Sequence, residues 1–360
     1  MVDRRDGNDV HEEPPGRGSV VMPLALASAG GGSVAAVSSR GTRARRVAGR
    51  VFGVPEMGLL VLLVVAFAGF TLLNSGFASG PNIESLFLTI AYTGIVMVGE
   101  AVLMIAGEFD LSVGSVAGMA AIIGGMLMAS KIGLPVPVAI VGGVVAGGLV
   151  GLANGILTVR VGIPAFVTTL SMLFVAKGIG YVLSGGDPVY PLPKGVAVLA
   201  GTDILGLPSA ILVFLLVVVV VDLLMRHTTF GRVVYATGGN PLTTRLAGIR
   251  TDRVKILAFT LCGSLAALGG LLLVSRMERA DASDGLGWEL NVIAACVVGG
   301  VALGGGAGTI AGAFLGLLLL QGVVQGLIII GVDSSLQPVV AGMVLIAAAS
   351  FDLYRRRRFS

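Results

Sequence analysis

Residues 226–255 read RHTTFGRVVYATGGNPLTTRLAGIRTDRVK, a polar stretch that carries six of the chain's lysines and arginines. Long apolar segments flank it on both sides, so it forms a hydrophilic loop between two segments suited to lipid. Asn240 and Pro241 are residue types preferred at the start of a helix, and Gly248 is the type preferred just after its end. The stretch therefore predicts a short helix on a basic loop, which is suited to docking a cytoplasmic partner.

The composition outside this loop indicates a membrane protein. The chain has 360 residues, of which 55% are hydrophobic and only 12% are charged, whereas soluble domains are about 25% charged. Its 56 glycines suit helices that pack closely through small residues. We predict an all-α, polytopic fold with ten transmembrane helices. The predicted segments are 55–73, 83–106, 111–129, 135–157, 163–183, 208–225, 255–275, 288–303, 307–328 and 335–351.

The distribution of positive charge predicts the topology. With both termini in the cytoplasm, nineteen of the 24 lysines and arginines lie on the cytoplasmic side, as the positive-inside rule requires. The basic balance therefore reflects topology and not nucleic-acid binding. We expect a disordered basic tail over 1–50, a transmembrane domain over 51–354 and a basic tail over 355–360; a cleaved signal peptide around 20–29 is the alternative for the first. The remaining cations are placed at or near the outer face: Lys131, Lys177, Lys194, Arg276 and Arg279.

Several classes of chemistry lack a sequence signature here. Cys262 and Cys296 both fall in apolar segments, which is typical of packing residues and not of a disulfide or a metal pair. No phosphate-binding loop, catalytic triad or metal-ligand cluster is visible. We therefore predict no enzymatic activity, no metal and no cofactor, with any ATP hydrolysis left to a separate protein.

Ionisable residues between and within apolar segments are the first candidates for a transport pathway. Residues 107–115 read GEFDLSVGS and place Glu108 and Asp110 between two spans. Asp110, with Ser112, could cap the following helix, or this break could line the pathway or its inner gate. Glu100 lies inside a span and is either a pathway residue or a carboxylate paired across helices.

Amide and aromatic side chains in the spans form a second group of candidates. Amides hydrogen-bond neighbouring helices as well as sugar hydroxyls, so both roles stay open. The aromatic residues Phe166, Phe174, Tyr181 and Trp288 could stack on a sugar ring or anchor the helices at the interface. The amide candidates are Asn154, Asn291, Gln321 and Gln325.

Four stretches together resemble a known family. Residues 107–115 look like its Gly-Gly-Ile-Asp-Leu-Ser-Val-Gly-Ser motif, and Asn154-Gly155 with VGIPAFVTTL at 161–170 matches its fourth-to-fifth helix junction. The basic loop 226–249 looks like its coupling segment, and the glycines of 299–312 match its Gly-rich turn. Over roughly 55–352, the chain resembles the permease subunits of ribose/xylose/arabinose-type ABC importers, in the family that also serves branched-chain amino acid uptake.

This resemblance implies a bacterial inner-membrane permease that moves a monosaccharide or related polyol delivered by an external binding protein. It implies a second permease subunit and cytoplasmic ATP-binding subunits, with a short helix over 238–249 seated on the latter. Leu242, Thr243 and Thr244 replace an acidic residue and two alanines that are usual there, and Glu108-Phe109 replaces Gly-Ile. The implied coupling residues are Gly238, Gly239, Asn240, Pro241, Arg245, Ala247, Gly248 and Ile249.

Two other functions remain open on the sequence. An ion-coupled secondary transporter or channel would use Glu100, Glu108 and Asp110 as a proton or ion relay. A membrane subunit that serves export or regulation is the third possibility. The energy source separates the first alternative from an ATP-driven importer, and the direction of transport separates the second.

Overall fold

The computed structural model describes residues 55–129, 131–204 and 206–333, together with 335, 336, 339, 342, 343 and 346. All of them belong to one unit, Ala48–Ser360. The predicted tails over 1–50 and 355–360 lie outside the described residues, and so does most of the predicted segment 335–351.

Helices account for nearly all the regular structure, and the longer ones follow the apolar segments. The longer helices are α2 (Pro55–Leu73), α3 (Gly80–Ile105), α4 (Val113–Met128), α5 (Val136–Ile156), α6 (Ala165–Ser184), α7 (Ser209–His227), α10 (Thr251–Met277), α11 (Trp288–Val298) and α12 (Ile310–Ile329). The shorter elements are α8 (Thr229–Gly239), α9 (Pro241–Leu246), the antiparallel strands β1 (Asp203–Ile204) and β2 (Leu207–Pro208), two 3₁₀ turns (Ser75–Ala78 and Lys194–Leu199) and a π-helical turn (Leu157–Val161).

The prediction of a polytopic helical membrane protein is confirmed, while the count of ten spans is not. Within the described ranges, six helices are long and apolar enough to cross a membrane, and α2 (over Met57–Leu73), α4 and α11 are shorter apolar helices. The predicted span 288–303 ends early, at Val298, because Gly299 packs against Gly312 and Gly300 takes a positive φ of 87°.

Glycines on α5 allow α10 to pack directly on its backbone. A Cβ at Gly151 would lie 2.2 Å from the Phe259 carbonyl oxygen, and one at Gly147 would lie 2.5 Å from the Gly263 carbonyl oxygen. With Gly143 and Gly155, these glycines recur every four residues and form one face of α5. This arrangement is the small-residue packing that membrane helices use, since lipid offers little hydrophobic drive to bring them together. Besides α5, α10 also contacts α3 and α4, and it therefore forms the centre of the helix assembly.

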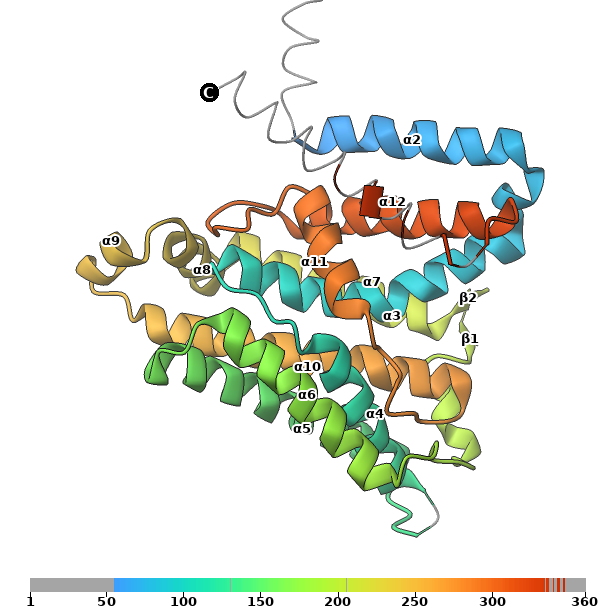
Figure 1. The fold of residues 1–360 in the computed structure, drawn as a ribbon, viewed down its shortest axis with the longest axis horizontal. Helices are drawn as coiled ribbons and strands as arrows, with labels where there is room; N and C mark the ends of the chain where they lie inside the picture. The colour runs from blue at the N-terminus through green and yellow to red at the C-terminus, as the bar shows by residue number, and fades with distance from the viewer. Residues whose placement is uncertain are drawn as a thin grey trace, which may run out of the picture. The chain divides into compact units, whose positions relative to one another are not determined.

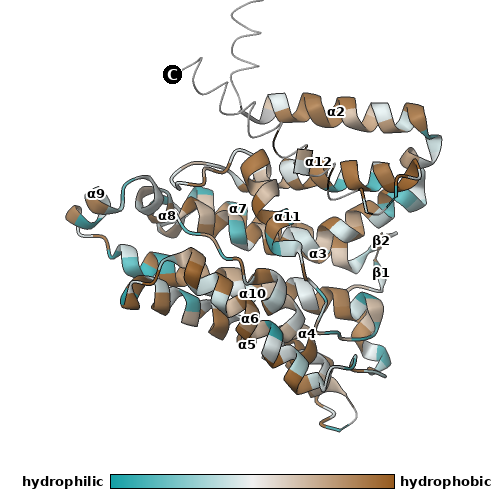
Figure 2. Ribbon diagram, viewed as in Figure 1, coloured by the Kyte–Doolittle hydropathy of each residue, from teal (hydrophilic) through white to brown (hydrophobic). Residues whose placement is uncertain are grey.

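The short elements lie at the ends of the long helices (Figure 1). The helix pair α8–α9 lies at one end, next to the start of α10, and β1–β2 lies at the other end (Figure 1). Figure 2 shows hydrophobic residues along most of α2, α5 and α12, and hydrophilic residues where α9 meets α10. The predicted basic loop 226–255 is therefore a folded cap of two helices.

Candidate functional site

A cluster of polar side chains lies in the interior where the break 106–112 meets α3 and α5. The Asp110 Oδ1 atom accepts hydrogen bonds from the Ser112 N–H at 2.7 Å and from its hydroxyl at 2.6 Å. The Asn154 side-chain amide, on α5, donates to Asp110 Oδ2 and to Ser112 Oγ, both at 3.0 Å. All three side chains are buried. These contacts tie the irregular backbone of the break to a neighbouring helix.

Glu100 of α3 belongs to the same cluster. Its Oε1 atom accepts a hydrogen bond from the Asp110 N–H at 3.0 Å, and its Oε2 atom accepts one from the Cys262 thiol of α10 at 3.4 Å. Glu100 is fully buried. In this structure Glu100 therefore bonds the break and α10 at once, while its role in the pathway stays a prediction. Cys262 and Cys296 are free and buried, as expected for packing residues.

The prediction that Asp110 caps the next helix needs correction. The N-cap of α4 is Ser112, and Ser112 makes no side-chain capping bond there. Asp110 stands two residues earlier and bonds the Ser112 N–H, which stabilises the turn before the helix instead. The residues of this cluster leave no exposed surface on which a solute could bind in this conformation.

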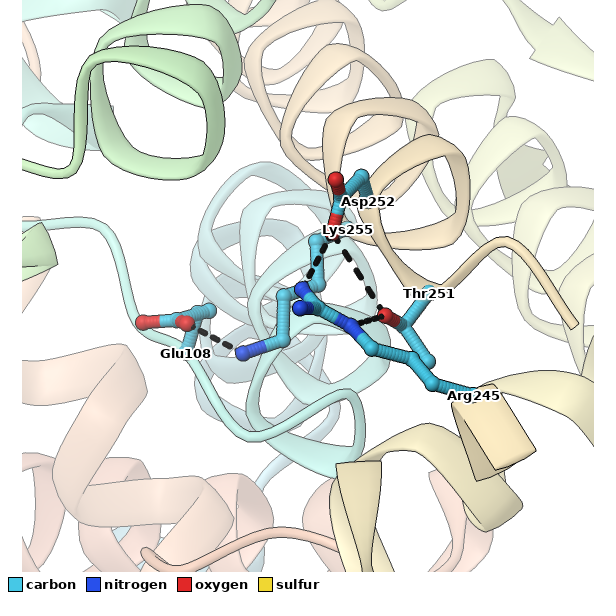
Figure 3. A network of polar contacts seen from close by, with 5 residues as sticks. All are labelled: Glu108, Arg245, Thr251, Asp252 and Lys255. Atoms are coloured by element: carbon cyan, nitrogen blue, oxygen red, sulfur yellow. Dashed lines mark hydrogen bonds and ion pairs between the residues drawn. The ribbon is translucent and has the colours of Figure 1, made fainter. Parts of the chain in front are cut away.

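A second polar group connects α9 to the start of α10 (Figure 3). Arg245 of α9 forms an ion pair with Asp252, and its Nε donates to the Thr251 hydroxyl at 2.6 Å. One turn further along α10, the Lys255 ammonium lies 2.5 Å from Glu108 Oε1. Because Glu108 is two residues from Asp110, these contacts lead from α9 to the break between α3 and α4.

Three backbone segments also meet at glycines beside this group. A Cβ at Gly238, in the last turn of α8, would lie 1.9 Å from the Ile105 carbonyl oxygen and 2.5 Å from the Gly306 nitrogen. The Gly306 N–H donates to the same Ile105 carbonyl at 2.9 Å. A Cβ at Gly305 would lie 2.7 Å from the Gly107 Cα and 2.9 Å from the Gly238 Cα. The end of α3, the end of α8 and the turn 299–309 therefore form one tight junction, which we call the glycine junction.

The helix pair α8–α9 is held to the glycine junction by its own side chains. The Tyr235 hydroxyl of α8 donates to the Gly308 carbonyl at 2.8 Å, and burial raises the pKa of Tyr235. Thr244 of α9 donates to the Ala236 carbonyl at 2.8 Å, which fixes the angle between the two helices.

The local prediction for α9 is confirmed. Asn240 caps the helix by accepting a hydrogen bond from the Thr243 N–H at 2.9 Å, and Pro241 occupies the first turn. Gly248 takes a positive φ of 83° just beyond the helix. The predicted extent is corrected, since Gly238 and Gly239 end α8 and α9 covers only Pro241–Leu246. Ala247 is the C-cap of α9, and Ile249 lies between α9 and α10.

The remaining predicted residues lie apart from both polar groups. The Gln325 amide of α12 donates to Asn82 Oδ1 of α3 at 2.5 Å, which is interhelical bonding. Gln321 is half-buried on α12, and Asn291 is exposed on α11. Phe166 and Phe174 are exposed on α6, and the Trp288 ring lies beside Gly269.

Sequence reasoning missed Lys177. The prediction places it at or near the outer face, whereas the structure places it within α6, about one turn before Gly180, which packs against Ala282. A single cation inside the apolar segment 163–183 was the available signal, because an ionisable residue within a span indicates a polar surrounding.

Exchanging the charges of the Glu108–Lys255 pair tests its contribution. Glu108→Gln and Lys255→Met each remove one charge of a half-buried ion pair. The loss of the pair should cost about 1 kcal/mol of stability and should lower uptake about fivefold. The exchanged pair, Glu108→Lys with Lys255→Glu, should recover most of the loss. Uptake by cells and the thermal midpoint of the purified protein measure both effects.

Asp222→Asn is the matched control, because it breaks the exposed ion pair between Asp222 and Arg226 in the last turns of α7. It should change uptake less than about twofold. If the exchanged pair performs no better than the single variants, the ion pair has no part in transport.

Comparisons with known proteins identify relatives over most of the chain. A model of the family described as "Branched-chain amino acid transport system / permease component" matches residues 82–349. An L-arabinose ABC transporter permease protein of Azospirillum brasilense is 36% identical over 301 residues, which are 84% of this chain and 88% of that protein. No solved structure matches the chain.

Two further relatives show the range of this similarity. The ribose import permease protein of Escherichia coli K12 is 33% identical over 303 residues, covering 82% of this chain and 93% of the relative. The autoinducer 2 import system permease protein of Salmonella typhi is 33% identical over 297 residues, covering 82% and 85% respectively.

Proposed function

The chain belongs to the branched-chain amino acid transport system permease family, and on this basis we propose that it carries a monosaccharide or related polyol through the bacterial inner membrane. In this proposal it is the membrane-spanning subunit of an ABC importer and hydrolyses no ATP itself. The relatives' names specify arabinose, ribose and autoinducer 2 import. These names favour a small hydroxylated solute and do not select one sugar.

The surface of α9 supports docking of a cytoplasmic ATP-binding subunit. Leu242 is 68% exposed and Leu246 is 81% exposed, although α9 lies in a hydrophilic cap and not among the apolar helices. Arg245 lies between them in the chain, and Arg250 and Arg253 follow shortly after, so the exposed leucines belong to a basic segment. Exposed leucines with a polar rim are typical of protein interaction sites.

The contacts of α9 with the rest of the chain support coupling of docking to transport. Arg245 links α9 to α10 through Asp252, and the glycine junction links α8 to α3 and to the turn 299–309. A displacement of α9 is therefore transmitted through backbone contacts and not through flexible side chains alone. Such rigid connections between packed helices are suited to a transition between two conformations.

The remaining partners and the full topology complete the proposal. We propose ten spans with both termini in the cytoplasm, a second permease subunit beside this one, and delivery of the solute by an external binding protein. The exposed apolar residues of α5, α6 and α7 supply surface for lipid and for the second subunit. The ATP-binding subunits would pair with the arginines around α9.

The observation that carries the proposal is the exposed pair Leu242 and Leu246 on a capped helix. Leu246→Ser should weaken co-purification of the ATP-binding subunit about tenfold, since burying a leucine contributes about 1.5–3 kcal/mol, and uptake should fall in parallel. Leu72→Ser is the control, because Leu72 is 88% exposed at the end of α2, far along the chain from the cap.

Reconstitution separates this proposal from ion-coupled transport. Vesicles that hold this chain alone should accumulate no solute, and addition of the ATP-binding subunits and ATP should start uptake. Uptake by the chain alone, driven by an ion gradient, would replace the proposal with the ion-coupled alternative.

A further inference from the structure

Residues 278–287 join α10 to α11 without regular structure, and their neighbours show how deep they lie. At the outer end, Ala280 and Val189 form a backbone bridge. The two nitrogen-to-oxygen distances of its hydrogen bonds are 2.8 Å and 3.2 Å. A Cβ at Gly125 would lie 2.8 Å from Ala280, one at Gly118 would lie 2.6 Å from the Ala282 carbonyl, and one at Gly114 would lie 2.3 Å from the Gly285 carbonyl. The segment therefore runs along α4 for eleven residues, a length of about 16 Å.

The far end of this segment lies level with the middle of two spanning helices. The Trp288 ring is 3.7 Å from a Cβ built at Gly269, and the Tyr92 carbonyl is 2.8 Å from the same position. Tyr92 is at the middle of α3, and Gly269 is eight residues from the outer end of α10, a distance of about 12 Å. Residues 276–287, which connect the predicted spans 255–275 and 288–303, are therefore not confined to the membrane surface: their backbone descends to the middle of the spans.

Because residues 278–287 reach membrane depth, their exposed side must face either protein or water. Irregular backbone at membrane depth is tolerated only where protein buries it or where it lines a water-filled cavity. The break 106–112 meets the first condition, because none of its residues is exposed. The segment 278–287 and the start of α11 meet it on one side only: Ala280, Ala282 and Gly285 are buried, whereas Ser283, Leu286, Gly287, Leu290 and Asn291 are exposed.

Charged groups on the same side of the molecule point to water independently. Arg279 pairs with Asp281 at 2.9 Å and approaches Asp284 at 3.8 Å. The buried Oε2 atom of Glu289 has no hydrogen-bond partner among the described residues. On α6, Gly180 packs against Ala282, with a built Cβ 3.2 Å from the Ala282 Cβ, and Lys177 stands about one turn before Gly180. Ionisable groups at membrane depth face a protein interior or a water-filled cavity, because their exposure to lipid is costly.

We infer that residues 278–291, flanked by Lys177 of α6, line the water-filled path along which the solute crosses the outer half of the membrane. Hydroxyl groups of a sugar would meet hydrogen-bonding side chains here in place of water. The inference rests on the proposed function only in calling this water-filled surface a solute path. The access of water itself is measured without any solute.

Cysteine labelling tests the path in membrane vesicles that contain the complete importer. Ser283→Cys and Leu286→Cys are each treated with a charged maleimide that does not cross membranes, in right-side-out and in inside-out vesicles. Val219→Cys on α7 is the control, since Val219 is 53% exposed among apolar residues. The native Cys262 and Cys296 are buried and should stay unlabelled.

We expect Ser283→Cys or Leu286→Cys to react more than about tenfold faster than Val219→Cys in at least one type of vesicle, because the thiolate is the reactive form and apolar surroundings suppress it. Labelling of both as slow as the control would overturn the inference, since lipid or a second copy would then seal the surface. Uptake of L-arabinose and D-ribose is measured in the same vesicles. Fast labelling without sugar uptake would refute the proposed solute class and leave the path in place.

Discussion

Gly238→Ala should abolish uptake and destabilise the folded permease. The added Cβ would lie 1.9 Å from the Ile105 carbonyl oxygen and 2.5 Å from the Gly306 nitrogen, both of which are backbone atoms that no side-chain rotation can move. The Gly306–Ile105 hydrogen bond would also be lost. Overpacking and a lost buried hydrogen bond together cost about 3 kcal/mol or more.

Thermal unfolding of the purified protein measures this loss, which should lower the midpoint by about 5 °C or more. Gly239→Ala is the matched control, because its Cβ would meet only the Gly306 Cα, at an ordinary 3.8 Å. The control should be neutral or slightly stabilising, since alanine favours helix over glycine. Equal behaviour of the two variants would show that the glycine junction is not closely packed.

Asp110→Ala should have the second large effect. The carboxylate accepts hydrogen bonds from the Ser112 N–H, the Ser112 hydroxyl and the Asn154 amide, and all three donors are buried. Its removal leaves these donors without that acceptor, at a cost of about 3 kcal/mol or more in the free energy of unfolding. Because the same bonds hold the break between α3 and α4, we expect uptake to be lost as well.

Asp333→Ala is the matched control for Asp110→Ala, because it removes the same kind of turn-stabilising carboxylate at an exposed position. Asp333 bonds the Ser335 N–H at 2.8 Å and the Ser335 hydroxyl, the same pattern that Asp110 makes with Ser112, but on the exposed surface. The Ser335 hydroxyl and N–H lower the pKa of Asp333, which shows that these bonds favour the charged carboxylate. Uptake and the thermal midpoint should hardly change. A similar small effect of Asp110→Ala would mean that water replaces the lost carboxylate.

The sequence was sufficient to predict elements that depend on local physics. Long apolar runs predicted the spanning helices, and Asn240, Pro241 and Gly248 predicted where a short helix begins and ends. The motifs also identified the family. Each of these signals consists of neighbouring residues in the chain, so no knowledge of the tertiary structure was needed to interpret it.

Partnerships between distant residues could not be predicted in the same way. Glu100, Glu108 and Asp110 were recognised as unusual carboxylates, but their partners Cys262, Lys255 and Asn154 lie on other helices. The segment 278–287 carries mixed charges and falls between two predicted spans, which favours an outer connection when the sequence alone is considered. Only its contacts with the glycines of α4 reveal its depth.

The glycine face of α5 has a consequence for the synthesis of the chain in the membrane. The helix α10, which covers that face, begins 95 residues after α5 ends at Ile156. At a translation rate of about 5–20 residues per second, α5 waits about 5–20 s for α10. During this interval the glycine face of α5 is open to lipid or to other helices, and Glu100 has no hydrogen bond from the Cys262 thiol. This permease is therefore most susceptible to wrong helix pairing before α10 is made, and α10 then covers the glycine face of α5.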